Sequence, residues 1–161
     1  MRVQMQSTVP CRIAVLAALP AGVYDARTAK YSPLTPPPAR IRPLILIIED
    51  SLDQLDLYGF ALGDHYQVLQ ATRGERGIEV AIAERPDVVL MDVCMPGMDG
   101  WEVCRLLKGD PRTASIPIIL LTALDGMEIA ERAMRSGATT LLMKPCNVET
   151  LRDEIDAATH G

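Results

Sequence analysis

Four short apolar runs in this chain each end in a side chain that can take part in chemistry. Such a run, bounded by turn residues, is typical of a strand buried on both faces of a sheet. The carboxyl ends of parallel strands meet at one edge, where ligands bind, so these side chains are expected to share one site. The runs and the residues that follow them are Leu44–Ile48 with Glu49 and Asp50, Val88–Met91 with Asp92, Ile118–Leu121 with Thr122, and Thr140–Met143 with Lys144.

The three carboxylates in this set predict a divalent cation. Neighbouring strands lie about 4.8 Å apart, so side chains at adjacent strand ends can reach one ion. Carboxylates at such a short separation repel each other and raise one another's pKa, and a hard cation relieves the repulsion. Oxygen ligands in an open site that keeps water molecules suit Mg²⁺. We expect Asp50 to bind the metal directly and Glu49 to act through a metal-bound water or as a weaker ligand. Asp92 and the backbone carbonyl of Cys94 are further candidate ligands.

Asp92 is the candidate nucleophile, because a carboxylate can accept a phosphoryl group and form an aspartyl phosphate. Lys144 would place a positive charge on one phosphoryl oxygen, and Thr122 a hydroxyl on another. Taken alone, Glu49-Asp50 is typical of a solvated turn, Thr122 of a strand end and Lys144 of a loop. Asp92 is harder to explain in that way, because buried strand ends seldom carry an unpaired charge.

Strands and helices alternate from Leu44 onward and would position these residues. Ser51 begins a helix to about Leu62 as the first residue of a capping box that Gln54 completes. The helix over Met127–Ser136 is expected to bury Ile129, Ala130, Ala133 and Met134. The other predicted elements are a strand over Gln67–Ala71 and helices over Glu75–Glu84, Trp101–Lys108 and, after the cap Asn147, from Val148 onward. This alternation predicts an α/β fold with a five-stranded parallel sheet and helices on both faces.

The 161 residues leave room for one ordinary domain and a tail. Residues 1–43 hold six basic residues, one acidic residue and five closely spaced prolines, and we expect a disordered extension ahead of a domain over residues 44–161. The remainder holds ten basic and twenty acidic residues, which argues against nucleic-acid binding. No apolar run is long enough for a membrane span.

Cysteine usage indicates the compartment. Cys11, Cys94, Cys104 and Cys146 have neither C-x-x-C pairing nor metal-ligand spacing, so we expect free thiols in a reducing cytoplasm. The apolar stretch Ile13–Leu19 is a poor secretory signal, because it is short and directly follows an arginine.

Together these residues resemble the receiver domain of bacterial two-component response regulators, over about residues 44–160. Glu49 and Asp50 resemble the family's acidic pair, Asp92 its phosphoacceptor, Met95–Gly100 the loop behind it, Thr122-Ala123 the switch hydroxyl and its small neighbour, and Lys144-Pro145 the signature Lys-Pro with its usually cis peptide bond. The resemblance implies a flavodoxin-like (βα)5 fold. It also implies phosphorylation by a histidine kinase or a histidine phosphotransfer protein, with Mg²⁺ bound.

Three positions depart from the family's pattern. Leu141 stands where the family usually has an aromatic residue that turns inward on activation. Cys146 stands where phenylalanine often follows Lys-Pro. Cys94 occupies a variable position that tunes the lifetime of the phosphoryl group, and its thiol offers no evident general base.

We therefore expect a single-domain phosphoacceptor protein that signals to partner proteins, since the last predicted helix reaches the end of the sequence. It would catalyse only its own phosphorylation and dephosphorylation. One alternative is a phosphatase with an aspartyl nucleophile, although such enzymes usually carry a carboxylate at the position of Cys94. Another is an interaction module that does not respond to phosphate. Nucleotide hydrolysis is poorly supported, because the chain has no phosphate-binding loop of the G-x-x-x-x-G-K-[ST] type.

Overall fold

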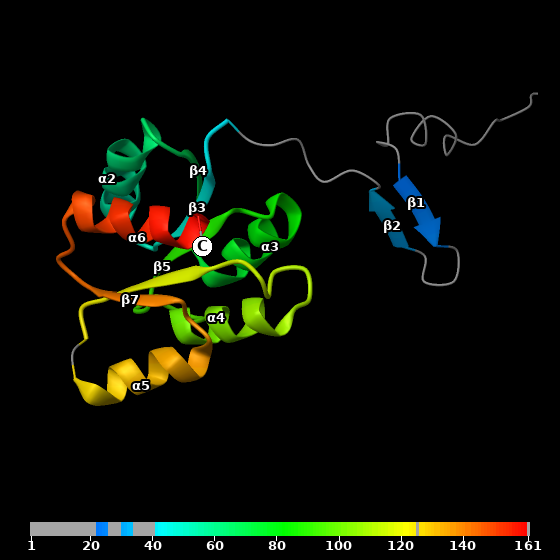
Figure 1. The fold of residues 1–161 in the computed structure, drawn as a ribbon. Coiled ribbons are helices and arrows are strands. Elements are labelled where there is room, and N and C mark those ends of the chain that lie inside the picture. Colours follow the sequence, from blue (N-terminus) through cyan, green and yellow to red (C-terminus); the bar gives the residue numbers. More distant parts are fainter. Residues whose placement is uncertain (1–21, 26–29, 34–40, 125, 161) are drawn as a thin grey trace, which may run out of the picture. The chain divides into compact units, whose positions relative to one another are not determined.

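The protein is described here by a computed structural model that covers residues 22–25, 30–33, 41–124 and 126–160 (Figure 1). The chain divides into two compact units, Met1–Ala39 and Arg40–Gly161. In the first unit, strand β1 (Gly22–Asp25) pairs antiparallel with β2 (Lys30–Pro33), a pairing that the sequence did not predict. Most of the extension that we expect to be disordered lies outside the described residues.

The second unit contains one sheet of five parallel strands, as predicted. Its order is β4-β3-β5-β6-β7, so the direction of strand succession reverses between β3 and β5. In open α/β sheets, ligands bind at the carboxyl ends of the strands on either side of such a reversal. The strands are β3 (Leu44–Ile48), β4 (Gln67–Ala71), β5 (Val88–Asp92), β6 (Ile118–Thr122) and β7 (Thr140–Met143).

Five helices cover the two faces of this sheet, as the strand–helix alternation predicted. Helices α2 and α6 lie on one face, and α3, α4 and α5 lie on the other (Figure 1). Within residues 41–124 and 126–160, no helix is long and apolar enough to cross a membrane. The helices are α2 (Leu52–Gly63), α3 (Gly74–Glu84), α4 (Gly100–Gly109), α5 (Met127–Ser136) and α6 (Val148–His160).

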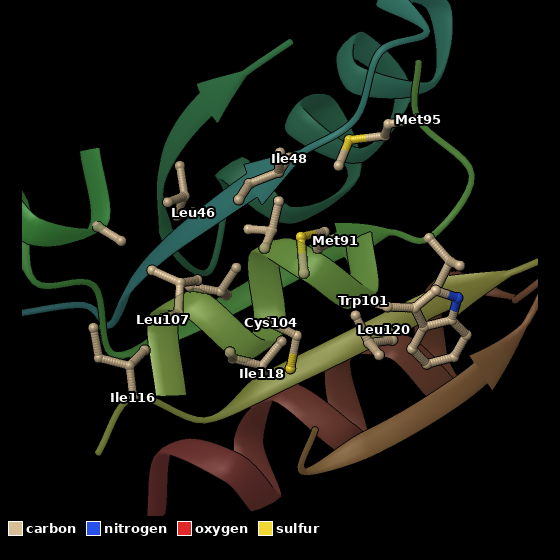
Figure 2. Close-up of a cluster of buried hydrophobic side chains, with 14 of the residues drawn as sticks. Leu46, Ile48, Met91, Met95, Trp101, Cys104, Leu107, Ile116, Ile118 and Leu120 are labelled. Carbon is tan, nitrogen blue, oxygen red and sulfur yellow. The ribbon is translucent and has the colours of Figure 1, made fainter. Parts of the chain in front are cut away.

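The core consists of two aliphatic layers separated by the sheet. Side chains alternate along a strand, so Val89 and Met91 face α3 and α4, whereas Val88 and Leu90 face α2 and α6. Figure 2 shows the first layer, in which Cys104 of α4 packs close to the strands. Three central strands, β3, β5 and β6, are buried at every position, which holds the residues at their ends rigidly.

Helix α5 differs from the prediction for its buried face. Ala133 is buried and Ile129 is half-buried, but Ala130 is exposed and Met134 is 73% exposed. Ser136 is buried instead. The helix packs beside β7, a four-residue edge strand, and rests on the sheet through the narrow stripe of residues 129, 133 and 136.

Candidate functional site

Three carboxylates meet at the carboxyl ends of β3 and β5. Glu49 and Asp50 directly follow β3, and Asp92 is the last residue of β5. One oxygen from each of the three lies within 4.8 Å of the others. Glu49 is 1% exposed and Asp92 is 7% exposed, whereas Asp50 is open to solvent. The structure therefore brings together the three acidic residues for which the sequence predicted a common site.

Lys144 supplies the counter-charge for this cluster. Its ammonium donates hydrogen bonds to Glu49 Oε2 at 2.9 Å, to Asp92 Oδ2 at 2.9 Å and to Gln54 Oε1 at 2.8 Å. Burial alone lowers the pKa of Lys144, but the hydrogen bonds and the charges of both carboxylates outweigh it and raise that pKa above the ordinary value. The side chain is thus held as a cation at neutral pH.

The start of α2 is capped differently from the predicted capping box. Ser51 Oγ accepts from the Gln54 backbone N–H at 3.4 Å, so the first half of the box is present. The second half is not, because the Ser51 N–H donates to Glu49 Oε1 at 3.2 Å instead of to the Gln54 side chain. That side chain turns to Lys144. The sequence therefore missed Gln54 as a site residue, although its place on the inward face of α2, one turn before buried Tyr58, was a signal for it.

The loop after β5 fixes the position of Asp92. The Cys94 N–H donates to Asp92 Oδ1 at 3.1 Å, and the Val93 N–H donates to the Leu121 carbonyl at 2.9 Å. Gly100, the first residue of α4, packs against the Asp92 carbonyl so closely that a Cβ at this position would collide with it. Only glycine fits at this close approach.

Thr122 lies at the end of β6, the strand next to β5. Its hydroxyl is fully buried and accepts a hydrogen bond from the Leu124 N–H at 3.0 Å. Its carbonyl accepts from the Lys144 N–H at 2.8 Å, so the backbone joins the two residues. Among the described hydrogen bonds, none links this hydroxyl to Asp92. The structure thus places Thr122 on the strand adjacent to Asp92, with its hydroxyl bonded to the Leu124 N–H.

The three positions that depart from the family pattern differ in their exposure to solvent. Leu141 of β7 is half-buried and packs against the first core layer. The peptide bond between Lys144 and Pro145 is cis, as the resemblance implied. Cys146 is half-buried, whereas the Cys94 side chain is exposed.

A polar contact joins α5 to the loop that follows Asp92. Asp99 caps α4, because its Oδ1 accepts from the Glu102 N–H at 2.8 Å. Arg132 of α5 donates to Asp99 Oδ2 at 3.3 Å, and its guanidinium lies 5.3 Å from the centre of the Trp101 ring. One arginine therefore links the start of α4 to α5.

Residues 45–156 match the model of the response regulator receiver domain. The chain belongs to this family. Both the family and the fold were predicted correctly from the sequence. As a receiver domain, the chain is a phosphoacceptor signalling module of two-component systems.

Two curated relatives differ in the share of their own length that this chain matches. Protein PilH from Pseudomonas aeruginosa is 40% identical over 118 residues, which cover 73% of this chain and 98% of PilH. Response regulator PleD from Caulobacter vibrioides is 42% identical over 102 residues, or 63% of this chain and 22% of PleD. The match thus spans nearly all of PilH but only about a fifth of PleD.

A solved structure gives the same architecture. The receiver domain of the sensor histidine kinase PA1611 from Pseudomonas aeruginosa has a TM-score of 0.70 to this protein at 25% identity. The match covers 74% of this chain and 99% of that domain. The solved domain has a magnesium ion coordinated in its active-site cleft.

Proposed function

We propose that this receiver domain accepts a phosphoryl group on Asp92 from a histidine kinase or a histidine phosphotransfer protein and passes the signal on through protein contacts. The observation that carries the proposal is the arrangement of one buried carboxylate, Asp92, beside the Lys144 ammonium and two further carboxylates. A nucleophile, a cation for phosphoryl oxygens and candidate metal ligands thus lie at one switch point of the sheet.

The donor set of the site fits Mg²⁺. Glu49, Asp50 and Asp92 each offer a carboxylate oxygen within 4.8 Å of the others, and hard oxygen donors are the ligands that Mg²⁺ prefers. The Cys94 carbonyl is proposed as a further ligand. When bound, the metal would neutralise negative charge on the transferring phosphoryl group. The magnesium ion in the related PA1611 domain supports this assignment.

The residues of the chain itself have separate roles in the transfer. An oxygen of Asp92 attacks phosphorus, the bond from phosphorus to the donor nitrogen breaks, and that nitrogen keeps the electron pair. The Lys144 ammonium then binds a phosphoryl oxygen in place of Asp92 Oδ2. The Thr122 hydroxyl binds another oxygen once it leaves the Leu124 N–H. Hydrolysis returns the Asp92 carboxylate and inorganic phosphate.

This exchange of hydrogen bonds gives the signal a route out of the site. Thr122 and Leu124 lead directly into the segment before α5, whose outward face is largely exposed. A shift of Thr122 toward the phosphoryl group would move this segment, and we propose that it acts as a two-state element biased by local charge. Because Leu141 is aliphatic, we propose that this route does not use an aromatic side chain of β7.

We further propose that the protein acts in the cytoplasm and turns over no external substrate. The described cysteines, Cys94, Cys104 and Cys146, are free thiols, as expected in a reducing compartment. The acidic balance of residues 44–161 disfavours a nucleic-acid partner. The partners are therefore expected to be the phosphodonor protein and a downstream protein.

The decisive test replaces Asp92 with Asn. With Mg²⁺ and acetyl phosphate as a small-molecule donor, intact-protein mass spectrometry should show one added phosphoryl group on the wild type and none on Asp92→Asn. The matched control is Asp56→Asn, an exposed residue of α2, which should be phosphorylated like the wild type. Phosphorylation of Asp92→Asn at the wild-type rate would overturn the proposal.

A further inference from the structure

Gln54 in the first turn of α2 is the third hydrogen-bond acceptor of the Lys144 ammonium. Its Oε1 lies 2.8 Å from Lys144 Nζ, as close as the two carboxylate acceptors at 2.9 Å. An ammonium group has three N–H donors and no acceptor. The three oxygens of Glu49, Asp92 and Gln54 therefore match the donors of Lys144 one for one.

The local cap of α2 leaves the Gln54 side chain available for this contact. In a capping box, a glutamine at this position would bond the backbone N–H of the cap residue. Here Glu49 Oε1 accepts from that N–H, at Ser51, so the glutamine amide is not needed there. The helix is anchored to the core by its buried residues Leu55, Tyr58 and Leu62, so the amide is presented from a fixed element.

The three acceptors of Lys144 differ in the other groups that each of them would bind. Glu49 and Asp92 are carboxylates of the acidic cluster, and each is a candidate ligand for a cation. In addition, a carboxylate oxygen of Asp92 is the atom to which the phosphoryl group would be bonded. The amide of Gln54 is neutral, so it attracts a cation less than a carboxylate does, and its Oε1 is not the atom that would be phosphorylated. It is the one acceptor that can stay on the ammonium while the other two exchange partners.

We propose that Gln54 is a positioning residue that holds the Lys144 ammonium at the phosphoryl site throughout the reaction. The inference rests on the proposed function, since it concerns phosphoryl transfer to Asp92. Gln54 itself touches neither the phosphoryl group nor the metal and acts only through Lys144. Without Gln54, the ammonium would form stronger hydrogen bonds to Glu49 and Asp92. It would then compete more strongly with a bound metal ion for their carboxylate oxygens.

The test replaces Gln54 with Met, which keeps the length and packing of the side chain but removes the acceptor. We expect the maximal rate of phosphorylation by acetyl phosphate to fall about tenfold, the effect of losing one hydrogen bond to a charged group. The donor concentration at half-maximal rate should stay unchanged, because Gln54 does not touch the donor. Gln67→Met, at an exposed position of β4, is the matched control and should behave as the wild type.

A double-variant comparison isolates the action through Lys144. In a Lys144→Ala background, Gln54→Met should have no further effect on the rate, because the group that it positions is gone. Isothermal titration with Mg²⁺ alone gives a readout that does not depend on phosphorylation. The metal should bind about threefold more weakly to Gln54→Met than to the wild type. In the Lys144→Ala background, the same substitution should leave Mg²⁺ binding unchanged.

Two results would overturn the inference. One is wild-type phosphorylation and Mg²⁺ binding by a folded Gln54→Met. The other is an equally large effect of Gln54→Met with and without Lys144, which would show a role that does not act through the ammonium. Failure of the proposed function is distinguishable, because it would appear as phosphorylation of Asp92→Asn or as no phosphorylation of the wild type.

Discussion

At the scale of single residues, one lysine balances two buried carboxylates. The Lys144 side chain is 14% exposed, and its two acidic partners, Glu49 and Asp92, are less exposed still. A buried ion pair is costly to break, because the remaining charge keeps its desolvation penalty without a partner. The site is therefore more stable when a cation lies between the two carboxylates.

Replacement of Lys144 by Met should make stability depend on Mg²⁺. Without metal, the free energy of unfolding should fall by about 2 kcal/mol, because Glu49 and Asp92 lose their counter-charge. Saturating Mg²⁺ should recover at least half of this loss, since the metal binds only the folded acidic cluster. Urea unfolding with and without Mg²⁺ measures both values. Lys108→Met is the control, because Lys108 donates to the carbonyls of Ala114 and Ile116, so its loss should not depend on metal.

The residues of the site were predictable to different degrees. Glu49, Asp50 and Asp92 could be found because each follows an apolar strand, and parallel strands bring such ends together. Gln54 could not be found in this way. Its sequence context matched a local capping box, and only the folded chain shows that Glu49 caps the helix in its place. Local and tertiary hydrogen bonds compete for the same side chain, and the sequence does not show which one prevails.

At the scale of elements, the first residue of α4, Gly100, lies against the carboxyl end of β5 at Asp92. Gly100→Ala should destabilise the protein by about 2–3 kcal/mol, since the added methyl group meets backbone atoms of Asp92 and Val93 that cannot move aside freely. Phosphorylation should slow in the same variant, because Asp92 is displaced. Urea unfolding and the acetyl phosphate assay measure the two effects.

Gly109→Ala is the matched control for this prediction. Gly109 ends the same helix, and a Cβ there has no atom within 4 Å. The substitution should change stability by no more than about 1 kcal/mol, in the stabilising direction, because alanine restricts the unfolded chain. Equal effects at positions 100 and 109 would contradict the close approach to Asp92.

The junction between α2 and α6 should lose stability at alkaline pH. Tyr66, just after α2, is buried and donates to Asp156 Oδ1 of α6 at 2.6 Å. Burial first, and then this hydrogen bond, raise the pKa of Tyr66 above its ordinary value of 10.0. Above pH 10 the unfolded chain therefore releases a proton that the folded protein keeps, and the contribution of Tyr66 to stability is lost as the pH rises.

Tyr66→Phe tests this dependence. At neutral pH the variant should be less stable by about 1 kcal/mol, the value of one hydrogen bond. The difference from the wild type should shrink between pH 10 and pH 11, because only the wild type has a phenol at position 66 that titrates. Lys144 also has a raised pKa but is present in both proteins, so it cancels in the comparison. A difference that stays constant up to pH 11 would contradict the shift.

At the scale of the whole molecule, the parallel sheet with two helical layers was the most predictable feature. Strands β3, β5 and β6 are uniformly apolar, and the helices between them carry apolar residues at helical spacing, so local pattern and tertiary structure agree. The buried face of α5 was less predictable. The apolar pattern of this helix does not show how many of its residues can be buried against the edge of the sheet. No hydrophobic pattern in the sequence predicted the pairing of β1 with β2.

Removal of residues 1–39 should leave the receiver domain intact. The shortened chain keeps Arg42, whose guanidinium donates to the carbonyls of Gly63 and Asp64 at the end of α2. Its free energy of unfolding should stay within about 0.5 kcal/mol of the full chain, because residues 45–156, which match the receiver domain, are all retained. The rate of phosphorylation by acetyl phosphate should also be unchanged. A loss of stability above about 1 kcal/mol would show that the first unit supports the domain.

The contact between Arg132 and Trp101 has a practical consequence. Trp101 is the single tryptophan of the chain, so tryptophan fluorescence arises from one known place, the start of α4 directly after the loop that follows Asp92. The cation over its ring belongs to α5, and the interaction between a cation and an indole ring is electrostatic and falls with distance. Any motion of α5 relative to α4 should therefore change the emission of this ring. The ring is therefore an intrinsic optical reporter of such a motion, which can be followed in real time without a label.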